Sequence, residues 1–319
     1  YKQRLLMKYA IETENLGRIY KTYSKQEGIL NSLKGFYNRQ YTEKVALKNA
    51  SFKAEPGKII GLVGSNGAGK TTLLKMLSGL IYPTTGSARV LGFEPSKREN
   101  EYLKQISILL GQKNQLWWDI TPRDSYALLT KIYNLNETSS KSRVTELAQL
   151  LQCQHVLDTQ LRRLSLGERM KMEIIGALLH SPKVLFLDEP TIGLDIVAQT
   201  TIRNFLEKYV KEQQPAIILT SHYMDDIAQL ADQLLLISKG EIVYDGSVDH
   251  FMQTTDLKKK LIYRLKNTTE EKEIVFNSQE LTQVLSDLAK AGDVVDLKVE
   301  EVDFEDVIHR FLQAESGAR

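Results

Sequence analysis

The run Gly64-Ser65-Asn66-Gly67-Ala68-Gly69-Lys70-Thr71-Thr72 limits the possible folds of this chain more than any other feature. It fits the pattern G-x-x-x-x-G-K-[ST]. An apolar segment of strand length, residues 58–63, precedes it, and a segment with helical spacing, residues 71–77, follows it. In that context the backbone N–H groups of the loop and the N-terminus of the helix can surround phosphate oxygens. The run therefore predicts an α/β fold that binds nucleotide phosphates, with Lys70 on the β- and γ-phosphates and Thr71 on Mg²⁺.

Composition narrows the class of protein. The chain has 319 residues, enough for about two domains, and its 42% hydrophobic and 26% charged residues are typical of a globular protein. The net charge of +2 argues against a general nucleic-acid-binding role. A basic excess before residue 48 and an acidic excess after residue 270 are typical of solvated faces. Cys153 is the only cysteine, which excludes an internal disulfide and favours a reducing compartment.

Hydropathy predicts no membrane span. No apolar run approaches the roughly 20 residues that a transmembrane helix needs, and the basic N-terminal segment is not followed by the apolar core of a secretory signal. We therefore expect a cytoplasmic protein that takes part in a membrane process only through a partner.

The pattern of elements divides the chain. Strands are expected at 10–16, 45–54, 58–63 and 88–91, with a polar, basic insert at 21–44. Helical spacing begins after Thr121-Pro122, in N-cap and N1 order, and recurs at 125–133 and 144–151. Strand and helix then alternate to residue 230, which indicates a mostly parallel sheet. Beyond a boundary near 254, three strands and two amphipathic helices predict a small α+β domain.

A second group of motifs follows the phosphate loop. Residues 184–187 form an apolar strand that ends in Asp188 and Glu189. A parallel sheet delivers such residues to the edge where ligands bind, so Asp188 is expected to hold Mg²⁺ and Glu189 to polarise an attacking water. Ser165 precedes a helix in N-cap position, within Leu164-Ser165-Leu166-Gly167-Glu168. Pro190-Thr191-Ile192-Gly193-Leu194-Asp195 and Thr220-Ser221-His222 complete the set.

In order and spacing these motifs resemble the ATP-binding cassette (ABC) ATPases, from about residue 10 to about residue 250. The resemblance implies a P-loop NTPase fold with an antiparallel β subdomain, a mostly parallel core sheet and a helical subdomain at about 113–165, all within residues 1–254, and leaves 255–319 as an accessory α+β domain. It implies ATP and Mg²⁺ as ligands. Its site would comprise Lys70, Gln112, Glu189 and His222 as catalytic residues; Gly64, Ser65, Asn66, Gly67, Ala68, Gly69, Lys70, Thr71, Thr72, Ser165, Gly167 and Asp195 at the nucleotide; and Thr71, Gln112 and Asp188 at the metal.

The adenine-stacking aromatic residue has two candidates. Tyr41 lies at the family's distance before Lys70, and Tyr20 takes that place if the insert is removed. We prefer Tyr41.

The signature loop departs from the family's usual Leu-Ser-Gly-Gly-Gln, because Leu166 and Glu168 replace a glycine and the glutamine. A branched residue at positive φ would cost about 1 kcal/mol or more. We therefore expect Leu166 to keep a negative φ and Glu168 to turn away from the nucleotide, which leaves Ser165 and Gly167 for binding.

The family resemblance also implies the partners. Each ATP would be clamped between the phosphate loop of one subunit and the signature loop of another, in a dimer with a second copy or a homologous ABC subunit. The segment 113–119, Arg162-Arg163-Leu164 and the insert resemble the ABC-2-type exporter branch, whose ATP-binding subunits lie on the cytoplasmic face of the plasma membrane beside a separate permease. Trp117 and Trp118 could receive a permease helix or pack in the helical subdomain. The competing hypotheses are a soluble ABC ATPase that acts on ribosomes or DNA and a regulatory ATPase. No nucleic-acid partner is expected.

Overall fold

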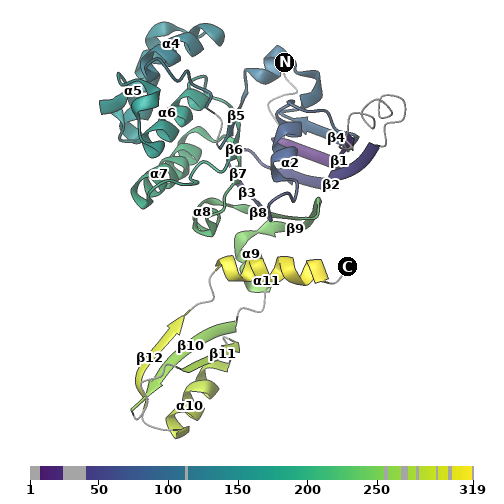
Figure 1. The fold of residues 1–319 in the computed structure, drawn as a ribbon, viewed down its shortest axis with the longest axis vertical. Helices are drawn as coiled ribbons and strands as arrows, with labels where there is room; N and C mark the ends of the chain where they lie inside the picture. Colours follow the sequence, from purple (N-terminus) through teal and green to yellow (C-terminus); the bar gives the residue numbers. More distant parts are fainter. Residues whose placement is uncertain are drawn as a thin grey trace, which may run out of the picture. The chain divides into compact units, whose positions relative to one another are not determined.

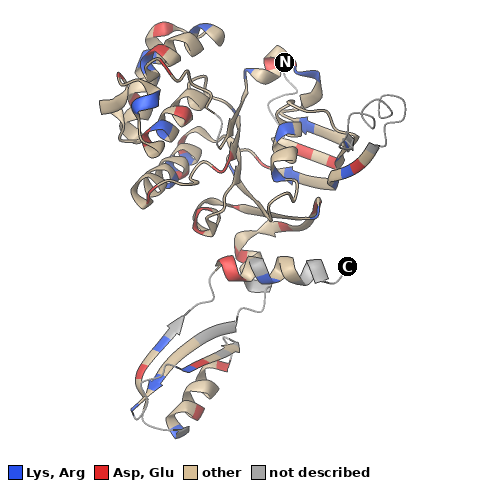
Figure 2. Ribbon diagram, viewed as in Figure 1, with Lys and Arg blue, Asp and Glu red and all other residues tan. Residues whose placement is uncertain are grey.

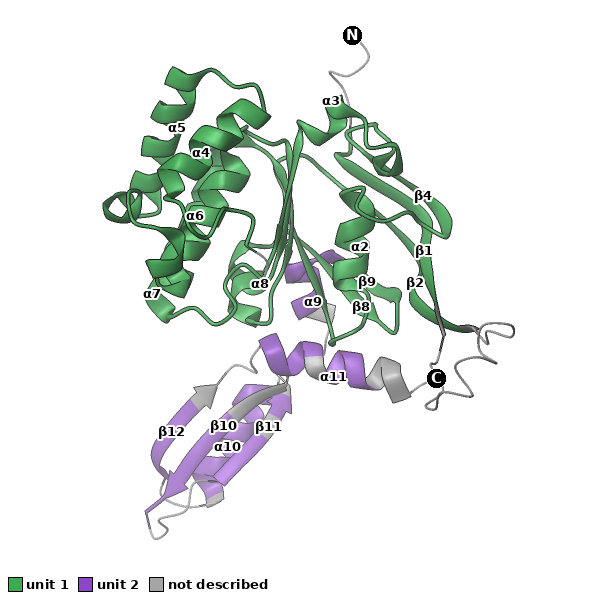
Figure 3. Ribbon diagram, turned by 45° about the horizontal axis from the view of Figure 1, so that its top comes forward, with its two compact units in different colours: residues 1–245 green, residues 246–319 purple. Residues whose placement is uncertain are grey.

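The computed structural model describes residues 8–23, 41–111, 114–254, 258–266, 272–277, 280–291, 294–300 and 304–317. It divides into two compact units, residues 1–245 and 246–319 (Figure 3). The division falls before the boundary expected at 254. The reason is that helix α9 (Val248–Thr254) belongs to the second unit, where the Phe251 ring meets the edges of Phe304 and Phe311.

The first unit is built on a six-stranded sheet with the order β5-β6-β7-β3-β8-β9. The neighbouring pairs from β5 to β8 are parallel. Every residue of β6 and β7 is buried, which explains their unbroken apolar sequence in place of an alternating one. The bounds of the strands are β3 (Ile59–Gly64), β5 (Ile106–Leu110), β6 (Val184–Asp188), β7 (Ala216–Thr220), β8 (Gln233–Ser238) and β9 (Glu241–Ser247).

A three-stranded antiparallel sheet, ordered β2-β1-β4, forms the second layer of this unit. Its strands are β1 (Ile11–Tyr23), β2 (Tyr41–Ala54) and β4 (Thr85–Val90). The first two extend beyond the expected 10–16 and 45–54 and include the ends of the predicted insert. The rest of that insert, 24–40, lies outside the described residues.

Helix α2 (Lys70–Leu77) lies between the two sheets (Figure 1). Leu73, Leu74 and Leu77 are fully buried on it, in one core with residues from both sheets. The phosphate loop enters this helix directly, so its position is fixed by the core. Short segments η2 (Pro95–Lys97) and α3 (Asn100–Leu103) follow β4.

The helical part of the first unit lies on the opposite side of the parallel sheet from α2 (Figure 1). Thr121 caps α4 by accepting a hydrogen bond from the Asp124 N–H, and Pro122 is its first residue, as predicted. The elements are α4 (Pro122–Ile132), α5 (Glu137–Leu150), η3 (Gln154–Val156), η4 (Leu161–Arg163) and α6 (Leu166–Leu178), and helices α7 (Ile196–Gln213) and α8 (Met224–Leu230) follow β6 and β7.

The second unit is an antiparallel sheet, ordered β11-β10-β12, with a helix packed on it. Leu288 of α10 contacts Leu261 and Phe276 of the sheet in a small apolar cluster. The elements are β10 (Lys258–Leu265), β11 (Lys272–Asn277), α10 (Leu281–Ala291), β12 (Val294–Glu300) and α11 (Phe304–Gly317). Acidic and basic residues are interspersed over the described parts of both units (Figure 2).

Candidate functional site

The phosphate loop turns from β3 into α2 through two glycines with positive φ. Gly67 has φ +80° and Gly69 has φ +115°. A Cβ atom on Gly69 would lie 2.5 Å from the carbonyl oxygen of Ala46, whereas one on Gly67 would meet nothing within 4 Å. Gly69 therefore needs to be glycine for two reasons, backbone conformation and space. No side chain caps α2, so no side-chain acceptor competes for the N–H groups at its start.

Lys70 is folded back over the loop. Its Nζ donates to the carbonyl oxygens of Gly64, at 2.5 Å, and Ser65, at 3.3 Å, and the residue is only 7% exposed. Burial lowers the pKa of Lys70, while Glu189 and Asp188 act to raise it. The ammonium group is thus held at the mouth of the loop with two acids close enough to support its charge.

Asp188 joins three strands at one point. Its Oδ2 accepts a hydrogen bond from Thr71 Oγ1 at 2.9 Å, and its Oδ1 accepts one from Thr220 Oγ1 at 2.7 Å. These contacts arise because β6 and β7 pair Asp188 with Thr220 in register, and β3 leads into α2 beside them. Thr71 and Asp188 together offer the hard oxygen ligands that Mg²⁺ prefers, and such sites commonly use few carboxylates because phosphates and water complete them.

Glu189 leaves the strand in a left-handed conformation, with φ +57°. Its N–H donates to the Thr220 hydroxyl at 3.0 Å and to the Thr220 carbonyl at 3.1 Å, which holds this uncommon conformation in place. Glu189 Oε1 then lies 2.9 Å from His222 Nε2, and the two side chains are 23% and 41% exposed. The acid and the imidazole predicted from separate motifs therefore meet at the carboxyl edge of the sheet.

A buried acid that the sequence analysis missed links the loops after β6 and β7. Asp226, which is 1% exposed, accepts hydrogen bonds from Thr191 Oγ1 at 2.5 Å and Ser221 Oγ at 2.7 Å. Its other oxygen lies 3.4 Å from Arg203 Nε, at ion-pair distance. Asp226 thereby couples the loop that carries Glu189 to the loop that carries His222.

Ser165 and Glu168 form a capping box at the start of α6. The Ser165 N–H and hydroxyl both donate to Glu168 Oε2, at 2.9 and 2.7 Å. These bonds lower the pKa of Glu168. Leu166 is the first residue of the helix and is absent from the described residues with positive φ, which confirms that it keeps a negative φ. Glu168 folds back onto Ser165. That Glu168 turns away from a bound nucleotide stays a prediction.

Asp195 lies beside the signature loop. It caps α7 by accepting a hydrogen bond from the Ala198 N–H at 2.8 Å. A Cβ on Gly167 would lie 2.9 Å from the Cβ of Ala198 and 3.8 Å from the Asp195 carboxylate. Within the described residues, the hydrogen bonds of Ser165 stay inside its own helix start, and none joins it to Gly64–Thr72. The chain thus assembles two separate groups of predicted nucleotide-binding residues.

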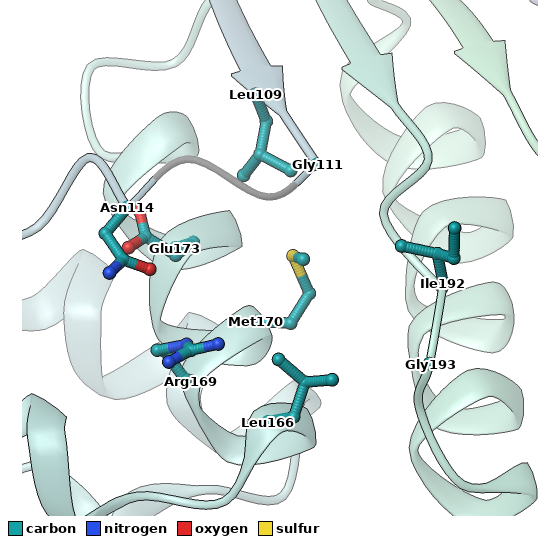
Figure 4. Close-up of a pocket in the computed structure, with 9 residues that line it drawn as sticks. All are labelled: Leu109, Gly111, Asn114, Leu166, Arg169, Met170, Glu173, Ile192 and Gly193. Carbon is teal, nitrogen blue, oxygen red and sulfur yellow. The ribbon is translucent and has the colours of Figure 1, made fainter.

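A pocket of about 350 Å³ lies between the N-terminal part of α6 and the loop after β6 (Figure 4). Glu173 on its wall is 5% exposed and accepts hydrogen bonds from the N–H groups of Gln115 and Leu116, and burial raises its pKa. This acid, also missed from the sequence, anchors the segment that follows Gln112 to α6. Its signal was a carboxylate directly before the apolar run 174–178 of α6. The pocket is lined by Leu109, Gly111, Asn114, Leu166, Arg169, Met170, Glu173, Ile192 and Gly193.

Two of the predicted site residues fall on undescribed positions. Gln112 lies outside the described residues, and so does the side chain of Tyr41. The backbone of Tyr41 begins β2 and pairs with Tyr23 of β1. Tyr20 is described: its ring lies under the Arg18 guanidinium, at 4.8 Å, and its backbone pairs with Lys44. The choice between Tyr20 and Tyr41 as the adenine partner stays a prediction.

Comparison with known proteins decides the family. The family described as "ABC transporter" matches residues 47–192. The ABC transporter ATP-binding protein NatA of Bacillus subtilis is 32% identical over 209 residues, which are 66% of this chain and 85% of that protein. The chain belongs to the ABC transporter ATP-binding family. Two further comparisons agree. The bacitracin transport ATP-binding protein BcrA of Bacillus licheniformis is 31% identical over 66% of this chain and 68% of its own length. The structure of a dimeric ATP-binding cassette bound to ADP and Pi matches 75% of this chain and 98% of its own, with a TM-score of 0.62 and 19% identity.

Membership in the ABC family confirms the predicted fold and the binding and hydrolysis of ATP. Among the described residues, no helix combines the length and apolarity needed to cross a membrane.

Proposed function

We propose that this chain is the nucleotide-binding subunit of an ABC-2-type exporter, a peripheral protein on the cytoplasmic face of the membrane that drives a separate permease. The observation that carries the proposal is the continuous set of contacts from Thr71 through Asp188 and Thr220 to Glu189 and His222, which equips the chain for ATP hydrolysis. The names of its relatives support the transport role, since BcrA is a bacitracin transport ATP-binding protein and another relative is a Nod factor export ATP-binding protein.

The chemistry is an in-line attack of water on the γ-phosphorus. Residues Gly64–Thr72 wrap the phosphates and Lys70 neutralises the developing charge. Thr71, Asp188 and Gln112 would hold Mg²⁺, which would supply further charge neutralisation. Glu189 would orient the water as general base, and His222, whose Nε2 lies 2.9 Å from Glu189 Oε1, would contact the γ-phosphate.

The second half of the site comes from another subunit. Ser165 is exposed at the start of α6, and Gly167 is buried beside Asp195. This helix start would close on the ATP held by the phosphate loop of a partner. A twofold dimer satisfies two such sites at once. ATP therefore acts as a ligand that joins the subunits, and hydrolysis releases them.

The Glu189→Gln variant tests the hydrolytic role. Loss of a general base reduces rates by roughly 10²–10⁴-fold, so we expect ATP to bind and the dimer to persist while turnover falls to that extent. Turnover is measured by phosphate release and dimerisation by light scattering with ATP. Normal turnover by Glu189→Gln would remove Glu189 from this role.

For adenine, we propose stacking on Tyr41, with Tyr20 as the alternative. Separate Tyr41→Ala and Tyr20→Ala variants decide between them. Substitution of the stacking residue should weaken the binding of ATP more than the binding of free triphosphate, whereas substitution of the other tyrosine should not.

The permease contact is proposed at Trp117 and Trp118. Both side chains are 41% exposed, and the Arg169 guanidinium lies 5.1 Å from the Trp118 ring, which holds an apolar lip in place at the surface. Co-purification with a polytopic membrane protein tests the proposal, with the double variant Trp117→Ala/Trp118→Ala expected to lose it. Ile132→Ala, at a more exposed apolar position on α4, is the control. Unchanged co-purification and transport would exclude the lip, and stable binding to ribosomes in place of a permease would favour a soluble ABC ATPase.

A further inference from the structure

Gln115 joins the segment after β5 to the parallel sheet. Strand β5 lies at one end of that sheet, where it pairs only with β6 among the described residues. The side-chain amide Nε2 of Gln115 donates a hydrogen bond back to the carbonyl oxygen of Ile108, in the middle of β5. Gln115 itself is exposed. The segment is therefore held to the edge of the sheet by a side chain that water can reach.

A buried carboxylate holds the same segment to α6. Glu173, which is 5% exposed, accepts hydrogen bonds from the N–H groups of Gln115, at 3.1 Å, and Leu116, at 3.3 Å. Its negative charge is supported by these two N–H groups and, at longer range, by Arg169. Movement of the segment away from α6 would leave a buried carboxylate without its N–H partners, which is unfavourable. The carboxylate therefore keeps the segment on the helix.

An apolar contact reinforces the attachment to α6. Leu116 is 5% exposed, and a Cβ on Gly176 would lie 3.0 Å from its Cδ2. Because Gly176 follows Glu173 by about one turn of the same helix, the carboxylate and the leucine side chain fix the segment at two successive points. Residues 115–116 and α6 are thus held as one body.

Both ends of this connection reach the predicted ATP site. Helix α6 begins directly after Ser165. Strand β5 leads to Gly111, whose N–H donates to the carbonyl oxygen of Asp188 at 2.8 Å. A Cβ on Gly111 would lie 2.6 Å from that oxygen and 3.5 Å from the Cβ of Glu189. Glu173 lines the pocket from α6 and Gly111 lines it from the end of β5 (Figure 4). The connection therefore runs from the signature helix to the backbone of the two adjacent acids.

We propose that Gln115 and Glu173 are positioning residues for ATP hydrolysis, which together form a bridge that fixes the signature helix α6 relative to β5 and the acids beside it. The Glu173 half of this bridge is buried and has several contacts, whereas the Gln115 half depends on one exposed hydrogen bond. The Gln115 half is therefore where α6 and the sheet separate first. The inference rests on the role proposed above for the signature loop. Neither side chain belongs to the phosphate loop, so loss of the bridge should slow turnover and leave ATP affinity unchanged.

The Gln115→Ala variant of the full chain tests the exposed half of the bridge. We expect kcat to fall by roughly threefold to tenfold, the worth of one net hydrogen bond, while the affinity for ATP stays that of the parent. Phosphate release at saturating ATP and titration calorimetry measure the two quantities. Asn114→Ala is the matched control, since this neighbouring amide is also exposed and makes no hydrogen bond among the described residues. Equal kcat values for the two variants would overturn the proposal.

A double-mutant cycle tests whether the two residues act as one bridge. Glu173→Gln keeps the size of the side chain but turns one acceptor into a donor that faces N–H groups, so its kcat should also fall. Because the two links lie in series, the double variant Gln115→Ala/Glu173→Gln should be no slower than the slower single variant. Multiplication of the two single effects would show that the residues act independently and would contradict the bridge.

Urea denaturation of the same variants separates positioning from stability. If the two residues were merely structural, the unfolding midpoint would fall and kcat per folded molecule would equal that of the parent. Should Glu173→Gln fail to fold, the comparison of Gln115→Ala with Asn114→Ala still decides, because both positions are exposed. Failure of the proposed function looks different: Ser165→Ala with the parent's turnover would contradict the role of the signature loop, whereas Gln115→Ala with the parent's kcat would contradict the bridge.

Discussion

The two glycine-containing loops of the nucleotide-binding unit are built in opposite ways. In Gly64–Thr72 the polar groups point inward: Lys70 covers the loop, Thr71 donates to Asp188, and two glycines with positive φ shape the backbone. In Ser165–Gly167 the backbone is an ordinary helix start, and the Ser165 hydroxyl is bound to Glu168 of the same turn. The first loop is organised by three neighbouring strands, whereas the second is organised only by its own helix and by α7.

This difference assigns different tasks to the loops. The phosphate loop holds its catalytic neighbours in place before a ligand arrives, so a single chain can bind nucleotide. Among the described residues, Ser165 makes no hydrogen bond to the phosphate loop, and under the proposed function its contribution depends on the approach of another subunit. Substitutions in the first loop should therefore affect binding by each chain, and substitutions in the second should affect only the steps that need two chains.

The largest effect is expected on ATP affinity, which should separate Lys70→Ala from Ser165→Ala. Loss of a buried, charge-assisted contact to phosphate should weaken ATP binding by about 100-fold in Lys70→Ala. The Ser165→Ala variant should bind ATP with an affinity within about twofold of the parent, while its turnover falls. Loss of the helix cap should cost only roughly 1 kcal/mol of stability. Titration calorimetry and phosphate release measure the two quantities. Lys75→Ala, on the same helix as Lys70, is the control, and equal loss of binding in Ser165→Ala would contradict the division of tasks.

The second comparison of the two loops uses the free energy of unfolding of the Gly69→Ala and Gly167→Ala variants. Alanine at position 69 would need a φ of +115° and would place Cβ 2.5 Å from a backbone oxygen. We expect Gly69→Ala to lower the free energy of unfolding by about 2–4 kcal/mol. Alanine at position 167 would place its Cβ 2.9 Å from the Cβ of Ala198 and 3.8 Å from the Asp195 carboxylate, but it would keep a helical backbone. We therefore expect a smaller loss for Gly167→Ala, of about 1–2 kcal/mol. Urea denaturation of both variants measures this difference, and the reverse ranking would refute the geometric argument.

Asp226→Asn should uncouple the two catalytic loops without touching the phosphate loop. An amide cannot accept from both Thr191 and Ser221 and also pair with Arg203, so a buried polar group loses a partner. The expected cost is about 1–3 kcal/mol of stability, with slower turnover and unchanged ATP affinity. Asp225→Asn, at the exposed neighbouring position, provides the control. If both variants hydrolyse ATP equally fast, Asp226 has no positioning role.

The smallest expected effect is on how the stability contributed by Glu168 of the signature loop depends on pH. Because the hydrogen bonds from Ser165 lower the pKa of folded Glu168, its carboxylate stabilises the fold above its ordinary pKa. This contribution is lost as pH falls through the lowered pKa, that is, below about pH 4.5. Glu168→Gln should therefore be less stable than the parent at pH 7, by about 0.5–1 kcal/mol, and the difference should shrink at pH 3. Thermal unfolding at both pH values measures it, and a difference independent of pH would argue against the capping carboxylate.

Local motifs were readable from the sequence because each depends on neighbours in the chain. The turn into α2, the caps Ser165 and Asp195, and the end of β6 at Asp188 belong to this class. The partners Thr220, Asp226 and Glu173 were missed because their roles depend on which elements lie side by side. Only the strand order β6-β7-β3 brings Thr220 to Asp188, and no periodicity in the sequence specifies that order.

The Thr220 hydroxyl has a single proton, and that fact gives the site a fixed polarity. The Glu189 N–H donates to this oxygen, and the hydroxyl in turn donates its hydrogen bond to Asp188. Since Thr71 donates to the same carboxylate from the other side, two hydroxyl protons converge on Asp188 and none is directed at the Glu189 carboxylate. The two adjacent acids therefore have different surroundings: Asp188 lies between two hydroxyl donors at the start of α2 and the end of β7, whereas Glu189 lies beside the His222 imidazole.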